Sequence, residues 1–142
     1  MLHKRSIDST AFEKVFEIAE DVPGDVQQLC EALWETTSYK GQISEQNITN
    51  ALKLIFARES KGYEATTVQL TGQQLKCLVG LAKTGGWAPQ SAAFLQAVGI
   101  RLPASVKKAL NRLEQLKIVY QYQGEYRLVN PFFKAWLRNK DF

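Results

Sequence analysis

The sequence predicts a mainly α-helical protein, and three observations carry this prediction. Apolar residues recur at the 3.6-residue period of amphipathic helices along most of the 142 residues. Within residues 91–130, Gly99 separates two such helices. Two short alternating segments follow and turn over at Gln123-Gly124. The order helix, tight turn, helix and hairpin is that of a winged helix-turn-helix with a short β-hairpin wing.

The first two predicted helices have clear start signals. Thr10 and Glu13 have capping-box spacing at the start of the first helix, whose apolar face comprises Phe12, Val15, Phe16 and Ala19. Asp25 is the expected N-cap of the second helix, which Gly41 ends. The apolar stripe of this second helix comprises Val26, Leu29, Cys30, Leu33 and Trp34.

The third helix marks the end of the first predicted module. It is expected to begin at Ser44, and its apolar stripe comprises Ile48, Ala51, Leu52, Ile55 and Phe56. The pattern fades over residues 64–69, which we take as the junction between two modules. Residues 1–66 then form a small helical module, and residues 69–142 form the winged-helix domain.

The second module carries further cap and turn signals. Its first helix opens with a capping box of Thr71 and Gln74 and ends at Gly85-Gly86. The helix predicted for residues 103–117 has an apolar sector of Val106, Ala109, Leu110, Leu113 and Leu116. The wing strands are expected at residues 118–122 and 125–129. The last helix starts with Asn130 as N-cap and Pro131 as first residue.

Charge is distributed unevenly along the chain, whose formal net charge is +4. Residues 1–68 hold 7 Lys or Arg and 11 Asp or Glu, net −4, whereas residues 69–142 hold 11 and 3, net +8. This asymmetry indicates an acidic module joined to one that can meet a polyanion.

The composition argues against several classes of protein. Hydrophobic residues make up 45% and charged residues 23%, and the apolar runs are only a few residues long. We therefore expect a cytoplasmic protein without a membrane span or signal peptide. Cys30 and Cys77 lie in apolar stripes without companion histidines, so we expect core residues rather than a zinc site or disulfide framework. His3 is the single histidine and is not expected to bind metal.

Catalysis is not predicted, so the protein is not expected to be an enzyme. Residues 80–84 imitate the end of a phosphate-binding loop but lack the Gly-Lys adjacency and the leading glycine. Carboxylate pairs such as Glu13 with Glu17 have the spacing of an exposed acidic helix face. Trp87 lies in a Gly/Pro loop and is the tryptophan that we expect to be partly exposed.

The candidate binding surface is the polar face of the helix predicted at residues 103–117, together with the wing. Lys and Arg can neutralise phosphates, and Asn and Gln can pair with adenine edges. The candidate DNA-binding residues are Ser105, Lys107, Lys108, Asn111, Arg112, Gln115 and Arg127. An ordinary solvated helix face would also carry such residues. The wing tip has Glu125 where a cation would serve DNA binding, so a protein partner stays open.

Three segments resemble parts of one known family. Residues 23–35 read Pro-Gly-Asp-Val-Gln-Gln-Leu-Cys-Glu-Ala-Leu-Trp-Glu, residues 104–120 run from Ala104 through Leu110 and Leu113 to Tyr120, and residues 126–138 read Tyr-Arg-Leu-Val-Asn-Pro-Phe-Phe-Lys-Ala-Trp-Leu-Arg. In order and spacing they are similar to the lid helix, the winged helix and the Tyr-x-Leu-x-Asp-Pro-Phe-x-x-x-Trp-Leu ending of archaeal-type P-loop ATPases of the AAA+ and STAND groups. Asn130 stands where that family has Asp.

The resemblance implies that the chain is the C-terminal part of a larger ATPase, with a lid-like module in residues 1–66. ATP and magnesium would bind the nucleotide-binding core, and no cofactor is expected on this fragment. The lid helix of this chain has no arginine in its early turns, where such lids place an ATP-sensing one. The implied partners are that core domain and DNA.

Two hypotheses follow from these patterns. The first is a non-catalytic module that binds double-stranded DNA through its basic helix. The alternative is a protein-interaction and regulatory module that docks on the ATPase core or another partner, or forms a homo-oligomer. In the alternative, the aromatic residues around Trp87 and Trp136 make the contacts.

Overall fold

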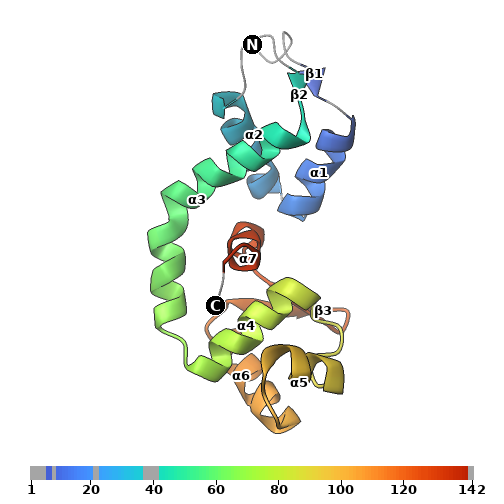
Figure 1. Cartoon of the computed structure of the whole chain (residues 1–142), viewed down its shortest axis with the longest axis vertical. Helices are drawn as coiled ribbons and strands as arrows, with labels where there is room; N and C mark the ends of the chain where they lie inside the picture. Colours follow the sequence, from blue (N-terminus) through green and yellow to red (C-terminus); the bar gives the residue numbers. More distant parts are fainter. Residues whose placement is uncertain (1–5, 8, 21–22, 37–41, 141–142) are drawn as a thin grey trace. The chain divides into compact units, whose positions relative to one another are not determined.

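The computed structural model describes residues 6–7, 9–20, 23–36 and 42–140 and confirms the mainly helical fold class (Figure 1). The described residues form seven α-helices and two small two-stranded sheets. The chain divides into two compact units, Met1–Lys61 and Gly62–Phe142. His3, which is not expected to bind metal, and Gly41, which is expected to end the second helix, lie outside the described residues.

The first unit contains a parallel strand pair and helices. β1 (Ser6–Ile7) pairs with β2 (Gln42–Ile43), and α1 (Ser9–Ala19) packs against α2 (Pro23–Thr36). α3 (Glu45–Val68) begins in this unit and carries the chain across the boundary at residue 61. The buried side chains of the unit include Ala11, Val15, Ala19, Leu29, Leu33, Ile48 and Ile55.

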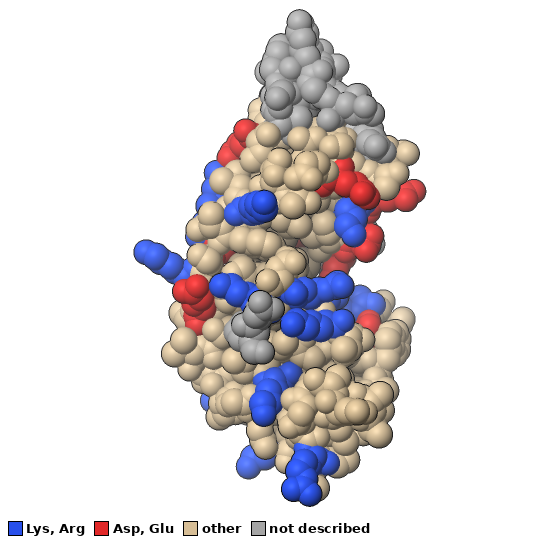
Figure 2. Space-filling view, viewed as in Figure 1, with Lys and Arg blue, Asp and Glu red and all other residues tan. Residues whose placement is uncertain are grey.

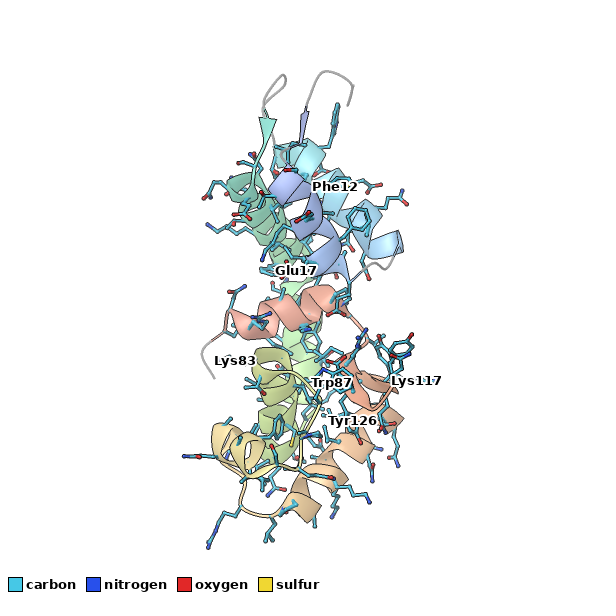
Figure 3. The ribbon with its side chains drawn as sticks, turned by 90° about the vertical axis from the view of Figure 1, so that its right-hand side faces the viewer. Phe12, Glu17, Lys83, Trp87, Lys117 and Tyr126 are labelled. Carbon is cyan, nitrogen blue, oxygen red and sulfur yellow. The ribbon has the colours of Figure 1, made fainter. Side chains whose placement is uncertain are left out.

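The apolar face predicted for α1 is wrong in part. Its buried stripe consists of Ala11, Val15 and Ala19, which follow one another at intervals of four residues and so lie on one face of the helix. These side chains are small and allow a neighbouring element to approach closely. Phe12 lies one residue outside this stripe, and its side chain is 51% exposed (Figure 3). Phe16 lies beside it, with 5.1 Å between the ring centroids.

α2 departs from its prediction at two positions. The helix begins at Pro23, two residues before the predicted N-cap Asp25, because proline is preset for the first turn of a helix. Asp25 is therefore a carboxylate in the first turn, where its negative charge interacts favourably with the helix dipole. Cys30 is exposed rather than buried, since it lies one residue beyond the buried Leu29. Cys77, in contrast, is fully buried as predicted.

α3 starts where the sequence predicts and continues further than its apolar pattern. The Ser44 backbone N–H donates to the Asn47 side-chain oxygen at 2.8 Å, which caps the first turn. The Thr66 and Thr67 hydroxyls donate to the carbonyls of Gly62 and Glu64, so these threonines fit within the helix. The segment taken as a junction is consequently helical as far as Val68.

The second unit has the predicted element order of a winged helix. It contains α4 (Gly72–Thr84), α5 (Ala92–Val98), α6 (Pro103–Gln115), β3 (Val119–Tyr122), β4 (Glu125–Leu128) and α7 (Pro131–Arg138). α4 is central, with α5 and α6 on one side and α7 on the other (Figure 1). The fully buried side chains include Leu78, Val106, Leu110, Leu113, Phe132 and Leu137.

Helix caps predicted from the sequence are confirmed in this unit. Thr71 accepts from the Gln74 backbone N–H at 3.2 Å, and the Gln74 side chain accepts from the Thr71 N–H at 3.0 Å. Gly99, in the left-handed region with φ 72°, ends α5. The Asn130 side chain caps α7 by accepting hydrogen bonds from the backbone N–H groups of Phe132 and Phe133, and Pro131 is the first residue of the helix.

The wing is an antiparallel hairpin that is held to the rest of the unit by a loop. Gln123 (φ 51°) and Gly124 (φ 83°) form a two-residue turn between β3 and β4 with both residues left-handed, as the tightest hairpins require. Each strand is one residue shorter than predicted. The Tyr126 N–H donates to the Gly86 carbonyl at 3.0 Å, so the loop after α4 runs against β4.

Aromatic side chains join α7 to the C-terminal part of α3. Tyr63 lies 5.0 Å from the Phe133 ring and 5.4 Å from the Trp136 ring, centroid to centroid. Trp136 is 5% exposed and belongs to the core, whereas Trp87 is 65% exposed, as predicted for its loop.

Candidate nucleic-acid interface

α6 has two chemically opposite faces. Val106, Ala109, Leu110 and Leu113 are buried beneath it, as their spacing predicts. Leu116, predicted to join them, is instead the C-cap residue and is partly exposed, because the helix ends one residue earlier. The opposite face is exposed along the whole helix from Lys107 to Gln115. Packing of the apolar face against α4 therefore fixes the polar face outward.

The polar face of α6 forms one wall of an open groove, and the first turns of α4 form the other. The groove has a volume of about 990 Å³. Six of the predicted site residues line it together: Ser105, Lys107, Lys108, Asn111, Arg112 and Gln115. The seventh, Arg127, does not line this groove.

The α4 wall could not be predicted from the sequence. Its lining residues include Thr71, Gln73, Gln74 and Lys76. The capping box at Thr71 located the start of α4, but no local pattern shows that this end of the helix opposes α6. Only the packing of the two helices brings Lys76 into the same groove as Arg112.

The cations of the groove are available to a ligand. Among the residues that the structure describes, no carboxylate forms an ion pair with Lys76, Lys107, Lys108 or Arg112. Arg112 donates from Nη1 to Gln115 Oε1 at 3.3 Å, which leaves its charge uncompensated. Figure 2 shows Lys and Arg side chains spread over the second unit, with few Asp or Glu on the face in view. The groove is therefore a site of positive potential.

Glu114 at the end of α6 ties the helix to the wing. Gln121 donates from Nε2 to Glu114 Oε1 at 2.8 Å. Tyr126, which pairs with Gln121 across the hairpin, also forms a hydrogen bond with Glu114. Burial, and then the charge and hydrogen bond of Glu114, raise the pKa of the Tyr126 hydroxyl. The one acidic residue of α6 is thus directed at the hairpin instead of the groove.

Arg127 lies on the wing with its charge engaged. Its Nε donates to Glu125 Oε1 at 2.5 Å, and its guanidinium carbon lies 5.2 Å from the centroid of the Tyr122 ring. The hydrogen bond to Glu125, followed by one to Tyr120, raises the pKa of the Arg127 guanidinium. The predicted site residues therefore fall into two groups. The cations of the groove have no acidic partner among the described residues, whereas Arg127 on the wing is paired with Glu125.

A comparison with protein families agrees with this architecture. The model of a family described as a probable winged helix domain matches residues 61–139, more than half of the chain. The chain belongs to this winged helix family. The match includes all of the helices and strands from α4 to α7, and so both the groove and the wing. No curated protein and no solved structure matches the chain.

Metal clusters and membrane spans are absent from the part of the chain that the structure describes. No three His, Cys, Asp or Glu side chains there have the arrangement of a metal site. None of the described helices combines the length and the apolar character needed to cross a membrane. The groove beside α6 is lined by cations, amides and hydroxyls, with no carboxylate or thiol among its lining residues.

Proposed function

We propose that this winged helix binds double-stranded DNA through the exposed face of α6, acting as a binding module and not as an enzyme. One observation carries the proposal. Lys107, Lys108 and Arg112 line a single groove with Lys76, and none of the four has an acidic partner among the described residues. Free cations that converge on one concave surface suit the phosphates of a polyanion.

The shape of α6 fits a duplex. Its 13 residues span about 20 Å, and a helix with its side chains is about as wide as the major groove of B-DNA, which is roughly 12 Å. In such a complex, Lys107, Lys108 and Arg112 would neutralise phosphates on either side of the DNA major groove. Asn111 lies between them and can offer its amide to an adenine edge.

The wing adds little positive charge to this interface. Its tip is Gln123-Gly124, and the guanidinium of Arg127 is bound by Glu125. We therefore expect the phosphate contacts of the α6 groove to dominate, so that binding is strongly dependent on salt and weakly dependent on sequence.

A titration tests the proposal. A fluorescently labelled random duplex is titrated with the full chain at several salt concentrations, and the slope of log affinity against log salt is measured. Replacing Lys107, Lys108 and Arg112 with Ala should weaken binding, and the slope should fall by about 0.9 for each phosphate that is no longer neutralised.

A matched control distinguishes the effect of the groove cations from the effect of net charge. Lys53, Lys61 and Arg138 are exposed and lie outside the groove, so replacing these three with Ala removes the same charge. The control variant should keep most of the affinity and the slope. If both triple variants lose the same affinity, net charge explains binding and the groove assignment fails. Absence of duplex binding at low salt would contradict the proposal as a whole.

A second function is favoured by a different observation, the exposure of Trp87. Its side chain is 65% exposed, and it borders a cavity of about 300 Å³ lined by Thr84, Phe94 and Ala97, among others. We propose that this site docks on a protein, either a second copy of the chain or the ATPase core that the sequence resemblance implies. Exposed tryptophans that border a pocket are typical anchors of protein interfaces.

Size-exclusion chromatography tests the docking function. The wild-type chain should elute as a larger species as its concentration rises, and Trp87→Ala should remain monomeric. The same variant should leave duplex affinity unchanged, because Trp87 is not part of the groove beside α6. Identical elution of the two proteins at all concentrations would exclude self-association through Trp87.

A further inference from the structure

We propose that the outer face of the wing stacks unpaired nucleobases, so that the chain prefers a duplex with a single-stranded extension to a blunt duplex. This inference rests on the proposed function for its ligand class, nucleic acid, and adds a second contact surface to the α6 groove. The surface is defined by Tyr120, Tyr122 and Arg127, and we refer to it as the tyrosine face.

The alternation of β3 creates the tyrosine face. Val119 is buried and Gln121 bonds to Glu114 of α6, so these two side chains point toward the helix. Tyr120 and Tyr122 must then project from the opposite side of the strand, where they are 40% and 51% exposed. Two large aromatic rings are thus left open to solvent on one side of a two-stranded hairpin.

The spacing of the two tyrosine positions along the strand suits bases. Residues i and i+2 of a strand lie about 6.8 Å apart, roughly twice the 3.4 Å rise between neighbouring bases of a nucleic-acid strand. Each ring can therefore hold one base of a short unpaired segment, or the two can hold one base between them. Stacking of this kind depends on the π-face that every base possesses and not on its sequence.

The charge on the tyrosine face favours a base over a phosphate. Arg127 pairs across the hairpin with Tyr120 and is bound to Glu125 at 2.5 Å, which leaves little net charge. Its guanidinium lies over the Tyr122 ring, 5.2 Å from the ring centre, and adds a second planar group to this face. A flat, nearly neutral surface with an arginine plane is suited to the faces of nucleobases.

A cation is available for the strand that such bases belong to. Lys117 is exposed and lies just before β3, in a left-handed conformation with φ 61° that places it at the edge of the hairpin (Figure 3). Its backbone N–H donates to the Glu114 carbonyl at 2.9 Å, which fixes this turn to the end of α6. Lys117 can thus contact a phosphate beside the tyrosine face.

The hairpin that carries the tyrosine face is hydrogen-bonded to α6, the helix that lines the groove. Glu114 of α6 holds Gln121 of β3 and Tyr126 of β4, so the hairpin is fixed to the helix whose polar face lines the groove. Bases inside a duplex are stacked on one another and cannot reach an aromatic ring. A nucleic acid that engages both surfaces therefore combines a duplex with an unpaired segment.

The experiment compares two DNA ligands with the full chain. One is a blunt duplex, and the other is the same duplex with a single-stranded extension that contains 2-aminopurine, whose fluorescence is quenched on stacking. The extension should raise the affinity by roughly tenfold and quench the fluorescence, as expected for one stacked base. Replacing both Tyr120 and Tyr122 with Ala should abolish the gain and the quenching but leave blunt-duplex affinity unchanged.

Conservative variants control for structural effects. Tyr122→Phe keeps an aromatic ring and should keep both the gain and the quenching. Circular dichroism of the double Ala variant should match that of the wild type, because both side chains are exposed. If that variant unfolds, Tyr122→Ala alone is used, and it should lose part of the quenching while Tyr122→Phe loses none.

The outcomes distinguish this inference from the proposed function. Equal affinity of the wild type for the two ligands, without quenching, overturns the tyrosine face and leaves duplex binding intact. Quenching that depends on the tyrosines, without any binding of the blunt duplex, supports the tyrosine face and overturns the duplex proposal. A change in self-association of the double Ala variant, with no change in DNA binding, assigns the face to protein contacts and overturns the inference.

Discussion

The polar face of α6 and the wing belong to the same small domain, yet their charges differ in availability. On α6, Lys107, Lys108 and Arg112 line a groove without an acidic partner among the described residues. On the wing, Arg127 is bound to Glu125 and packs over Tyr122. Formal charge in the sequence is the same for Arg112 and Arg127, but only Arg112 is open to a polyanion.

The difference arises from the periodicity of each element. On a strand, residues two apart share a face, so Glu125 and Arg127 meet as neighbours. On a helix, neighbours on one face are three or four apart, and positions 111 and 112 offer no acid to Lys107 and Lys108. Glu114 lies toward the hairpin and bonds there. In these two elements, the period therefore gives Arg127 a carboxylate on its own face and gives Lys107 and Lys108 none.

The largest effect should come from the buried face of α6, which holds the groove in place. Leu110 is fully buried, so Leu110→Ala should lower the free energy of unfolding by about 3 kcal/mol. Lys108→Ala, on the exposed face, should change it by less than about 0.5 kcal/mol. Urea denaturation measures both. Equal costs for the two variants would mean that the two faces of α6 are not distinct as described.

A smaller effect should come from the attachment of the wing. A Cβ at Gly86 would overlap the Tyr126 carbonyl oxygen, so Gly86→Ala should displace β4 and cost about 2 kcal/mol of stability. Gly62 has open space around it within α3, and Gly62→Ala should stabilise the chain by about 0.5 kcal/mol. Thermal unfolding that shows the same sign for both variants would contradict the close contact between loop and wing.

Local signals explain the parts of the fold that the sequence predicted. The capping box at Thr71, the left-handed Gly99, the Asn130 cap and the Gln123-Gly124 turn each depend on residues only a few positions apart. Their chemistry is complete within one turn of chain, so it can be recognised without knowing the tertiary structure. The polar face of α6 is predictable for the same reason, since it follows from the helical period alone.

Tertiary packing decided what the sequence could not. Phe12 and Val15 are equally apolar, and only the neighbours of α1 determine that Val15 is the buried one. The contribution of Lys76 to the groove depends on how α4 crosses α6. β1 and β2 have two residues each, too few for an alternating pattern, and they pair although Ile7 and Ile43 lie far apart in the sequence.

The smallest expected effect is also the sharpest test of the difference between α6 and the wing. Arg112→Gln should reduce the slope of log duplex affinity against log salt by about 0.9, because a free cation is removed. Arg127→Gln should leave the slope unchanged, since the guanidinium is already bound to Glu125. Both variants lose one charge, so net charge cannot explain a difference between them. If Arg127→Gln lowers the slope as much as Arg112→Gln does, the ion pair between Arg127 and Glu125 must open when DNA binds. The wing would then contribute a phosphate contact as strong as that of Arg112.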